Sequence, residues 1–203
     1  MKIPTGYAPL LLFCVLIAAS PTAQAAAILY NGNDYFLTST AESWTAAEAE
    51  AEADGGFLAS IHSAADETFI IEDFLDVQTS PDPLWIGLVD PDTSDGSGTQ
   101  HAADFVWSDG TAVNYTNWQS GEPNNANNSE YFTALNWHYA ATGDASDLGT
   151  WNDTPLDGTT GYGGTSDGPY FGIIEVSAAP EPSTIALSLI GAAALALRRR
   201  RVR

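Results

Sequence analysis

The chain has 203 residues, which is enough for one domain of ordinary size between its terminal segments. Its formal net charge is −20, and all six basic residues lie near the two ends, so residues 27–179 contain no Lys or Arg. This charge distribution excludes nucleic acid and anionic membrane surfaces as partners of the central part, because like charges repel.

The first 25 residues have the features of a secretory signal. Lys2 precedes an apolar run over residues 8–19, and Ala23-Gln24-Ala25 forms a small-x-small cleavage site. The alternative is a buried first helix. We predict a signal peptide over residues 1–25 and a folded domain over 27–178. The only cysteine, Cys14, would leave with the signal, so no disulfide is expected in the mature chain.

The first half of the central part predicts one hairpin and two helices. Residues 28–38 alternate between apolar and polar side chains around an Asn-Gly turn, which is typical of a hairpin. An Ala/Glu-rich segment from Ser43 to Asp54 is closed by two glycines and predicts an amphipathic helix. Residues 57–61 predict a short buried strand. A second helix is expected to begin at Ser63, with acidic residues in its first turn.

The second half predicts short strands separated by long polar loops. Residues 84–88 predict an inner strand, 131–137 a further strand and 170–176 the final strand. The rest of the chain up to Asp153 is predicted to be mostly loop. Early helices, later short strands and loops gathered at one end indicate an α+β domain.

The stretch of residues 121–153 carries five side chains with oxygen donors, three of them carboxylates and two of them amides. Calcium takes 6 to 8 oxygen ligands of these kinds. We therefore predict a calcium site made by Glu122, Asn124, Glu130, Asn152 and Asp153. The alternative is that Glu-Pro-Asn and the asparagine run after it are only turn chemistry.

The same donors predict sugar binding. An ionised carboxylate only accepts hydrogen bonds, whereas an Asn can give its carbonyl oxygen to a metal and still donate from its NH₂ group. Two neighbouring sugar hydroxyls on the ion could donate to Glu122 or Glu130 and accept from Asn124 or Asn152. The stretch has no nucleophile beside a base and no cofactor loop, so we expect a binding protein and no enzyme.

Aromatic and histidine side chains receive mostly structural interpretations. Four tryptophans are expected in the core, and not as sugar-stacking platforms: Trp85, Trp107, Trp118 and Trp151. Trp137 or Tyr139 could line the site. Three histidines lie in polar contexts and are expected to have no metal role: His62, His101 and His138.

Several ordered motifs over residues 27–176 resemble a C-type lectin domain. The residues that carry the resemblance are Trp44, Ala47, Gly55, Leu58-Ala59-Ser60-Ile61, Trp85-Ile86-Gly87-Leu88, Trp107-Ser108-Asp109-Gly110, Glu122-Pro123-Asn124, Glu130, Trp151-Asn152-Asp153 and Gly172-Ile173-Ile174-Glu175. The resemblance implies a C-type lectin-like α+β fold with two helices flanking small antiparallel sheets and a long loop region. It implies that the five oxygen ligands form the sugar-binding calcium site, that the Glu-Pro bond is cis, and that the sugar is of mannose type.

Two departures from the family pattern concern its cysteines and its auxiliary calcium. Where the resemblance places cysteines, this chain has Ala51 and Ile174 for one bridge, and Phe132 and Leu156 for the other. All four are apolar, so we expect buried contact in place of each covalent link. Tyr131 stands where many relatives have an Asp that helps to hold a second calcium, so no second ion is expected.

The C-terminal segment, residues 179–203, resembles the PEP-CTERM sorting signal of Gram-negative bacteria. Pro-Glu-Pro-Ser-Thr at 180–184 precedes an apolar run over 185–197 and a cluster of arginines. This run is shorter than the ~20 residues that cross a bilayer, so we expect transient membrane association. The resemblance implies processing by an exosortase-type enzyme and release to the envelope or an exopolysaccharide matrix. The alternative is a simple tail anchor.

Together these features predict an exported, calcium-dependent carbohydrate-binding protein with mannose-type selectivity, whose partner is an envelope or matrix polysaccharide. The alternative is a structural or protein-binding lectin-like module in which calcium only stabilises the loops. A hydrolase is disfavoured because the carboxylates of the stretch are better explained as ligands.

Overall fold

The computed structural model describes residues 26–75, 82–92, 102–161 and 163–178, and the remaining residues lie outside the description. The helices within these ranges are α1 (Trp44–Ala53), α2 (Ala64–Phe74) and α3 (Trp137–Thr142), with short 3-10 turns η1 (Ala126–Asn128), η2 (Ala145–Asp147) and η3 (Gly164–Ser166). The strands are β1 (Ile28–Tyr30), β2 (Asn33–Leu37), β3 (Phe57–Leu58), β4 (Leu84–Val89), β5 (Val106–Trp107), β6 (Phe132–Leu135), β7 (Trp151–Thr154) and β8 (Phe171–Ser177).

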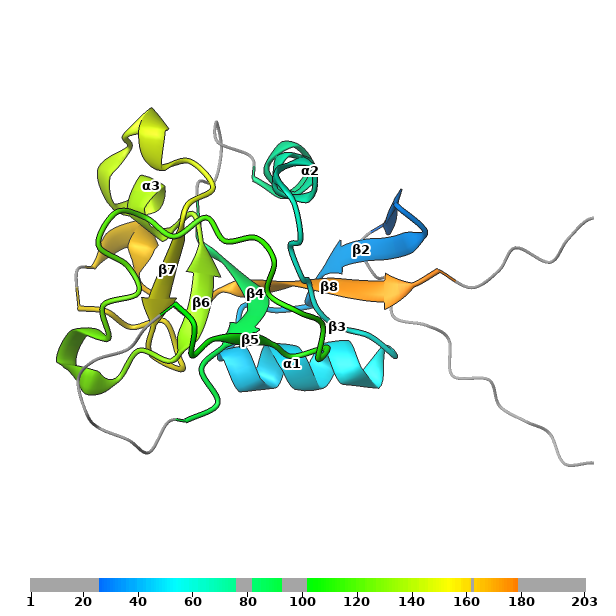
Figure 1. Ribbon diagram of the computed structural model, residues 1–203, viewed down its shortest axis with the longest axis horizontal. Helices are drawn as coiled ribbons and strands as arrows, with labels where there is room; N and C mark the ends of the chain where they lie inside the picture. The colour runs from blue at the N-terminus through cyan, green and yellow to red at the C-terminus, as the bar shows by residue number, and fades with distance from the viewer. Residues whose placement is uncertain (1–25, 76–81, 93–101, 162, 179–203) are drawn as a thin grey trace, which may run out of the picture.

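The sheet is organised around the last strand. Its order is β1-β2-β8-β4-β6-β7, with β3 paired to β8 and β5 paired to β4. The contact between β4 and β8 is parallel, and the other pairings are antiparallel. The C-terminal strand therefore joins an N-terminal hairpin to the strands β4, β6 and β7, which lie at the other end of the molecule (Figure 1).

Local sequence signals explain the N-terminal elements. Asn31 and Gly32 both have positive φ, which suits the tight turn of a two-residue hairpin and confirms the predicted β1–β2 pair. Ser43 is the N-cap residue of α1. Ser63 caps α2, and its side chain accepts a hydrogen bond from the backbone N–H of Asp66. Both predicted helices are thus confirmed, and each has its predicted serine as the N-cap residue.

The two long helices lie on opposite sides of the sheet (Figure 1). Phe69 and Ile70 of α2 pack into a cluster with strand residues such as Ile86. Trp44 of α1 packs into a different cluster, which contains Trp85. The sheet is therefore buried on both faces, and burying this apolar surface is the main driving force for the fold.

Tryptophans form the interior, as the sequence predicts. Trp85, Trp107 and Trp151 are at most 1% exposed, while Trp118 is half-buried and packs edge-on against Trp151. The indole N–H of Trp85 donates to the carbonyl of Glu42, and that of Trp44 donates to the carbonyl of Ile86. Because both of these indoles find backbone acceptors, the two bonds fix the start of α1 against β4.

Two predicted strand boundaries and one predicted loop region are wrong. The strand predicted over 131–137 covers only Phe132–Leu135, because Asn136 adopts a left-handed conformation and α3 begins at Trp137. The strand predicted over 57–61 is Phe57–Leu58, although the N–H of Ala59 still bonds the carbonyl of Ile173. The region predicted as mostly loop up to Asp153 contains α3 and β7.

One of the two predicted cysteine replacements is confirmed. Ala51 and Ile174 are fully buried in one small cluster with Phe36, so apolar packing occupies the place of that bridge. The second expectation is wrong, because Leu156 is 42% exposed while Phe132 is buried and lies opposite Thr154 in the sheet. The backbone carbonyl of Leu156 instead accepts from the N–H of Trp44.

Restoring the first bridge should stabilise the domain. In the double variant Ala51→Cys/Ile174→Cys, a disulfide would close a long loop between α1 and β8 and so restrict the unfolded chain. We expect the oxidised form to gain about 2–4 kcal/mol in unfolding free energy over its reduced form, measured by denaturant titration. The single variant Ala51→Cys is the control. Equal stabilities with a fully formed bridge would contradict the prediction.

Candidate functional site

The loop that carries Glu-Pro-Asn is fastened to β7. Both carboxylate oxygens of Asp153 accept backbone hydrogen bonds, one from the N–H of Asn124 at 3.0 Å and one from the N–H of Asn125 at 2.7 Å. Glu130 accepts from the N–H of Ala126 at 2.7 Å. The peptide bond between Glu122 and Pro123 is cis, as the resemblance implies.

The asparagines that follow have a conformational role. Asn125, Asn127 and Asn128 all have positive φ, a region that Asn tolerates better than most residues. The side chain of Asn125 is buried, and its oxygen accepts from the N–H of Glu130. Turn chemistry therefore explains this run of residues. The flanking side chains of Asn124 and Glu130 are left to line a pocket.

Four of the five predicted ligands line one pocket of about 70 Å³. These are Glu122, Asn124, Glu130 and Asn152. They come from the 121–130 loop and from β7, which are adjacent because Trp118 forms a β-bridge with Trp151 and Asp153 holds the loop. Asp153 is fully buried and does not line this pocket. Its carboxylate instead holds the loop through the N–H groups of Asn124 and Asn125.

His138, which the sequence assigned no role in the site, lies in this pocket. Its Nε2 atom is 3.2 Å from Oε1 of Glu122 and 3.1 Å from Oδ1 of Asn152. It belongs to α3, whose formation the sequence does not predict. Trp137, at the start of the same helix, also lines the pocket and confirms one of two predicted aromatic positions, whereas Tyr139 is not among the lining residues.

The carboxylates of the site are short of positive charge. Burial, together with the charges of Asp153 and Glu122, raises the pKa of Glu130 to about 8, against the lowering effect of the Ala126 N–H. Burial likewise raises the pKa of Asp153 to about 7, although its backbone hydrogen bonds lower it. Oε2 of Glu122 is buried and has no hydrogen-bond partner among the described residues. Such groups are stabilised by a cation.

His138 supplies part of this positive charge. Burial lowers the pKa of the His138 imidazole, but the hydrogen bond to Glu122 and its charge outweigh burial, and the net pKa is raised. In its protonated form the ring makes an ion pair with Glu122, over 3.2 Å. One such cation would face the carboxylates of Glu122, Glu130 and Asp153, so the site would keep a net negative charge when all three are ionised.

The donor set fits a hard divalent cation. Glu122, Glu130, Asn124 and Asn152 offer carboxylate and amide oxygens around one space, and a buried carboxylate oxygen is unpaired there. In the described part of the chain, however, no three His, Cys, Asp or Glu side chains already stand in the arrangement of a metal site. His138 contacts oxygens of Glu122 and Asn152, so a cation that used these oxygens would have to replace its contacts.

Two family models match the chain. The Lectin C-type domain matches residues 40–157, which is more than half of the chain, and the PEP-CTERM protein-sorting motif matches residues 178–201. The sorting motif indicates export and sorting to the cell surface. None of the helices in the described ranges is long and apolar enough to span a membrane, and the apolar run 185–197 falls outside those ranges.

Curated relatives and solved structures agree with the first match. A C-type lectin mannose-binding isoform from Notechis scutatus scutatus is 37% identical over 129 residues, covering 63% of this chain and 72% of the relative. Ladderlectin from Oncorhynchus mykiss is 34% identical over 119 residues, covering 59% of this chain and 54% of the relative.

Two structural neighbours confirm the fold. The cow C-type carbohydrate-recognition domain of CD23, solved in the presence of GlcNAc2Man3 oligosaccharide, has a TM-score of 0.55 and 25% identity, covering 78% of this chain and 98% of that domain. Human lithostathine has a TM-score of 0.55 and 20% identity, covering 74% of this chain and 96% of its own.

The raised pKa of Glu130 predicts how stability depends on pH in the presence of a chelator. The folded domain holds a proton on Glu130 up to about pH 8, whereas the unfolded chain releases it near 4.5. The folded state therefore binds more protons between these values, and stability should fall as pH rises from 5 to 9, by about 5 °C or more in melting temperature.

The matched control is Glu130→Gln, which keeps an oxygen for the Ala126 N–H but cannot ionise. This variant should show a shallower decline, the remainder coming from Asp153 and from Glu67, whose pKa burial raises to about 7. A wild-type domain that becomes more stable over this pH range, or a variant with an unchanged slope, would contradict the assignment.

Proposed function

This chain belongs to the C-type lectin domain family, and on that premise we propose that it is an exported, calcium-dependent carbohydrate-binding protein with mannose-type selectivity. Its sorting motif supports a location at the cell envelope or in an exopolysaccharide matrix, after processing by an exosortase-type enzyme and transient membrane association through residues 185–197. We propose binding without catalysis, because coordination of a metal ion accounts for the carboxylates of the pocket.

The observation that carries this proposal is the convergence of Glu122, Asn124, Glu130 and Asn152 on one pocket. These residues are as many as thirty positions apart in the chain, and the β7 pairing and the Asp153 hydrogen bonds bring them together. The relatives named as mannose-binding isoforms support the same sugar class.

Glu122, Asn124, Glu130 and Asn152 would hold calcium, with Asp153 adding an oxygen if its backbone bonds rearrange. The bound ion would supply two coordination positions for neighbouring hydroxyls of the sugar. Glu122 and Glu130 would accept hydrogen bonds from those hydroxyls, while the amide NH₂ groups of Asn124 and Asn152 would donate to them. No second calcium is proposed, since Tyr131 is a buried aromatic residue at the position concerned.

Such a shallow polar site should bind a single sugar with a Kd of roughly 1 mM, which corresponds to about −4 kcal/mol. Retention on a polysaccharide would then depend on many copies acting on a repetitive polymer. This proposal suits a protein that is sorted to the cell surface, where polymer and protein are both concentrated.

A second candidate function is a structural or protein-binding lectin-like module in which calcium only stabilises the loops. The observation that favours it is the contact of His138 with Glu122 and Asn152. These oxygens are already hydrogen-bonded, whereas a sugar site would need them for the ion and for the sugar hydroxyls. In that case cation binding would raise the melting temperature without creating a sugar site.

The test combines a calcium titration with glycan binding. Calcium should raise the melting temperature, because an ion bound only by the native state stabilises it. Binding to immobilised mannan should appear with calcium and vanish with a chelator. Glu122→Gln, which removes a charge and keeps the shape, should abolish both effects. Stabilisation by calcium without mannan binding would favour the second candidate, and no response to calcium would overturn the proposal.

Exchanging the polar pattern of the loop should change which sugar is bound. In the double variant Glu122→Gln/Asn124→Asp, the carboxylate and amide trade places, so the hydrogen-bond directions offered to the two hydroxyls reverse. We expect preference to move from mannose-type toward galactose-type sugars by about tenfold in relative inhibition of mannan binding, with the calcium-dependent melting shift retained. Unchanged selectivity would count against these residues as hydroxyl readers.

A further inference from the structure

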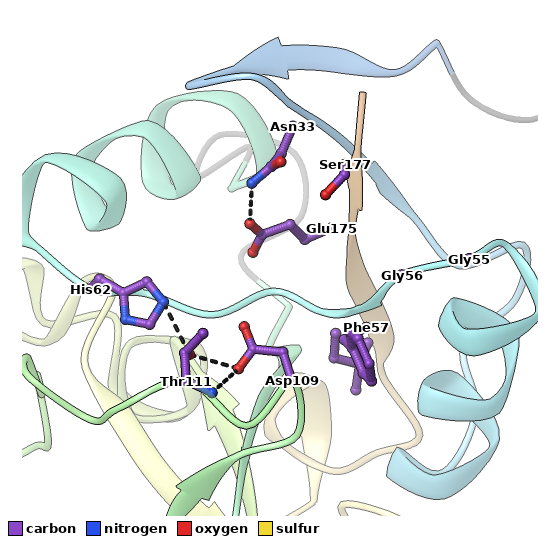
Figure 2. Close-up of a pocket in the computed structure, with 10 residues that line it drawn as sticks. Asn33, Gly55, Gly56, Phe57, His62, Asp109, Thr111, Glu175 and Ser177 are labelled. Carbon is purple, nitrogen blue, oxygen red and sulfur yellow. Dashed lines mark hydrogen bonds between the residues drawn. The ribbon is translucent and has the colours of Figure 1, made fainter. Parts of the chain in front are cut away.

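A larger pocket, of about 380 Å³, lies at the other end of the domain. Its walls come from the glycines that follow α1, from β3, from the turn after β5, and from the start of β2 and the end of β8 (Figure 2). Figure 1 shows the C-terminal end of β8 far from α3 and β7, which carry the site described above. This volume is in the usual range for small-molecule sites.

Two carboxylates in this pocket are held in place by neighbouring groups. Glu175 of β8 accepts from Nδ2 of Asn33 at 2.6 Å and from the N–H of Ser60 at 3.1 Å. Asp109 uses Oδ1 to accept from the N–H and the hydroxyl of Thr111, at 2.7 and 2.6 Å. The hydrogen bonds of the described residues leave Oδ2 of Asp109 without a donor, so this oxygen is available to a ligand.

The pocket has negative charge and no Lys or Arg to balance it. Residues 27–179 contain no Lys or Arg, so neither Asp109 nor Glu175 has such a partner within the chain's central part. A third carboxylate, Glu48, is buried nearby. Burial chiefly raises its pKa, and the charge of Asp109 contributes in the same direction. A cationic ligand would be attracted into this field.

An exposed phenyl ring, an imidazole and a hydroxyl complete the pocket. Phe57 of β3 is 38% exposed beside Asp109, and the preceding Gly55 and Gly56 have no side chains that could cover the ring (Figure 2). On the opposite side, Nε2 of His62 is 3.3 Å from the hydroxyl of Thr111. The pocket thus offers an apolar face, carboxylate acceptors and groups that can exchange hydrogen bonds with hydroxyls.

We propose that this pocket is a second, calcium-independent binding site for an amino sugar that carries a free ammonium group. The ammonium lies between Asp109 and Glu175, the C–H face of the sugar ring packs on Phe57, and ring hydroxyls bond His62 and Thr111. Carboxylates favour the ammonium over the acetamide of an N-acetylated sugar, because charge-assisted hydrogen bonds are stronger than neutral ones. An aromatic face suits either the ring or the cation.

The proposal goes beyond the lectin site and does not depend on it. A chain with two sugar sites at opposite ends can contact two polymer strands at once, or two positions of one strand that bends around it. Either arrangement raises the retention of a weakly binding protein on a polysaccharide. The two sites would also respond differently to conditions, since only the loop site would need calcium.

The test measures binding of a glucosamine disaccharide and of its N-acetylated counterpart to the exported chain, by calorimetry at pH 7 with EDTA present. We expect the amine form to bind at least about fivefold more tightly, and less tightly in 0.5 M salt, where charge attraction is screened. Asp109→Asn should weaken this binding about fivefold, while retaining an oxygen for the Thr111 N–H. Glu122→Gln should leave it unchanged.

Two further measurements guard the interpretation. The melting temperature of Asp109→Asn checks that the fold persists, and Phe57→Ala tests the pocket without touching a charge, so it should weaken binding of the amine as well. Equal affinity for both disaccharides, unchanged binding in both variants, or loss of binding in Glu122→Gln would each overturn the proposal. Failure of mannan binding by itself would affect only the calcium site.

Discussion

The site depends on two hydrogen bonds, from the backbone N–H groups of Asn124 and Asn125 to the carboxylate of Asp153. They join a loop without regular structure to β7, which is itself held by its ladder with β6. Asp153 is fully buried, so leaving its carboxylate without these donors would be costly. Sequence-distant oxygens therefore converge because one buried acidic group needs partners and the loop supplies them.

The same acidic groups make the domain dependent on its surroundings. Folding places Glu130 and Asp153 close together in a buried space where neither has a basic side chain, and the desolvation and repulsion raise the pKa of both. A protein with Lys or Arg beside them could satisfy them internally, but residues 27–179 contain neither. Positive charge must come from His138, from protons or from a cation in solution, which links the stability of the loop to the composition of the medium.

Elements with strong local signals were predictable from the sequence. The Asn31-Gly32 turn and the capping serines of α1 and α2 act over a few residues, so their effect can be recognised without the fold. The five candidate ligands were also recognisable by type and spacing, and four of them meet around one pocket. Their roles as calcium ligands remain predictions.

Other features depend on tertiary context. The sequence of β7 is mostly polar, so it carries no apolar pattern that predicts a strand. Its residues Asn152, Asp153 and Thr154 are nevertheless buried, and hydrogen bonds satisfy their polar groups. Asn136 ends β6 by adopting positive φ, which no local pattern requires. The exposure of Leu156 could not be foreseen, because whether an apolar residue is buried depends on what the fold brings against it. The predicted signal peptide over 1–25 and the whole predicted sorting segment over 179–203 lie outside the described residues.

The helix α3 determines what a cation would have to replace in the pocket. It brings Nε2 of His138 to about 3 Å from oxygens of both Glu122 and Asn152, so these two groups are already hydrogen-bonded. A cation that binds them must break those contacts, and its net binding free energy is the coordination energy less the free energy of the bonds it replaces. Oε2 of Glu122 carries no such cost, so an approaching ion would engage it first. Glu130 would have to release the proton that its raised pKa retains, and its Oε2 already accepts from the Ala126 N–H. The amide of Asn152 would follow once the imidazole had turned away, and the strength of the site would then be set as much by α3 as by the loop that supplies its oxygens.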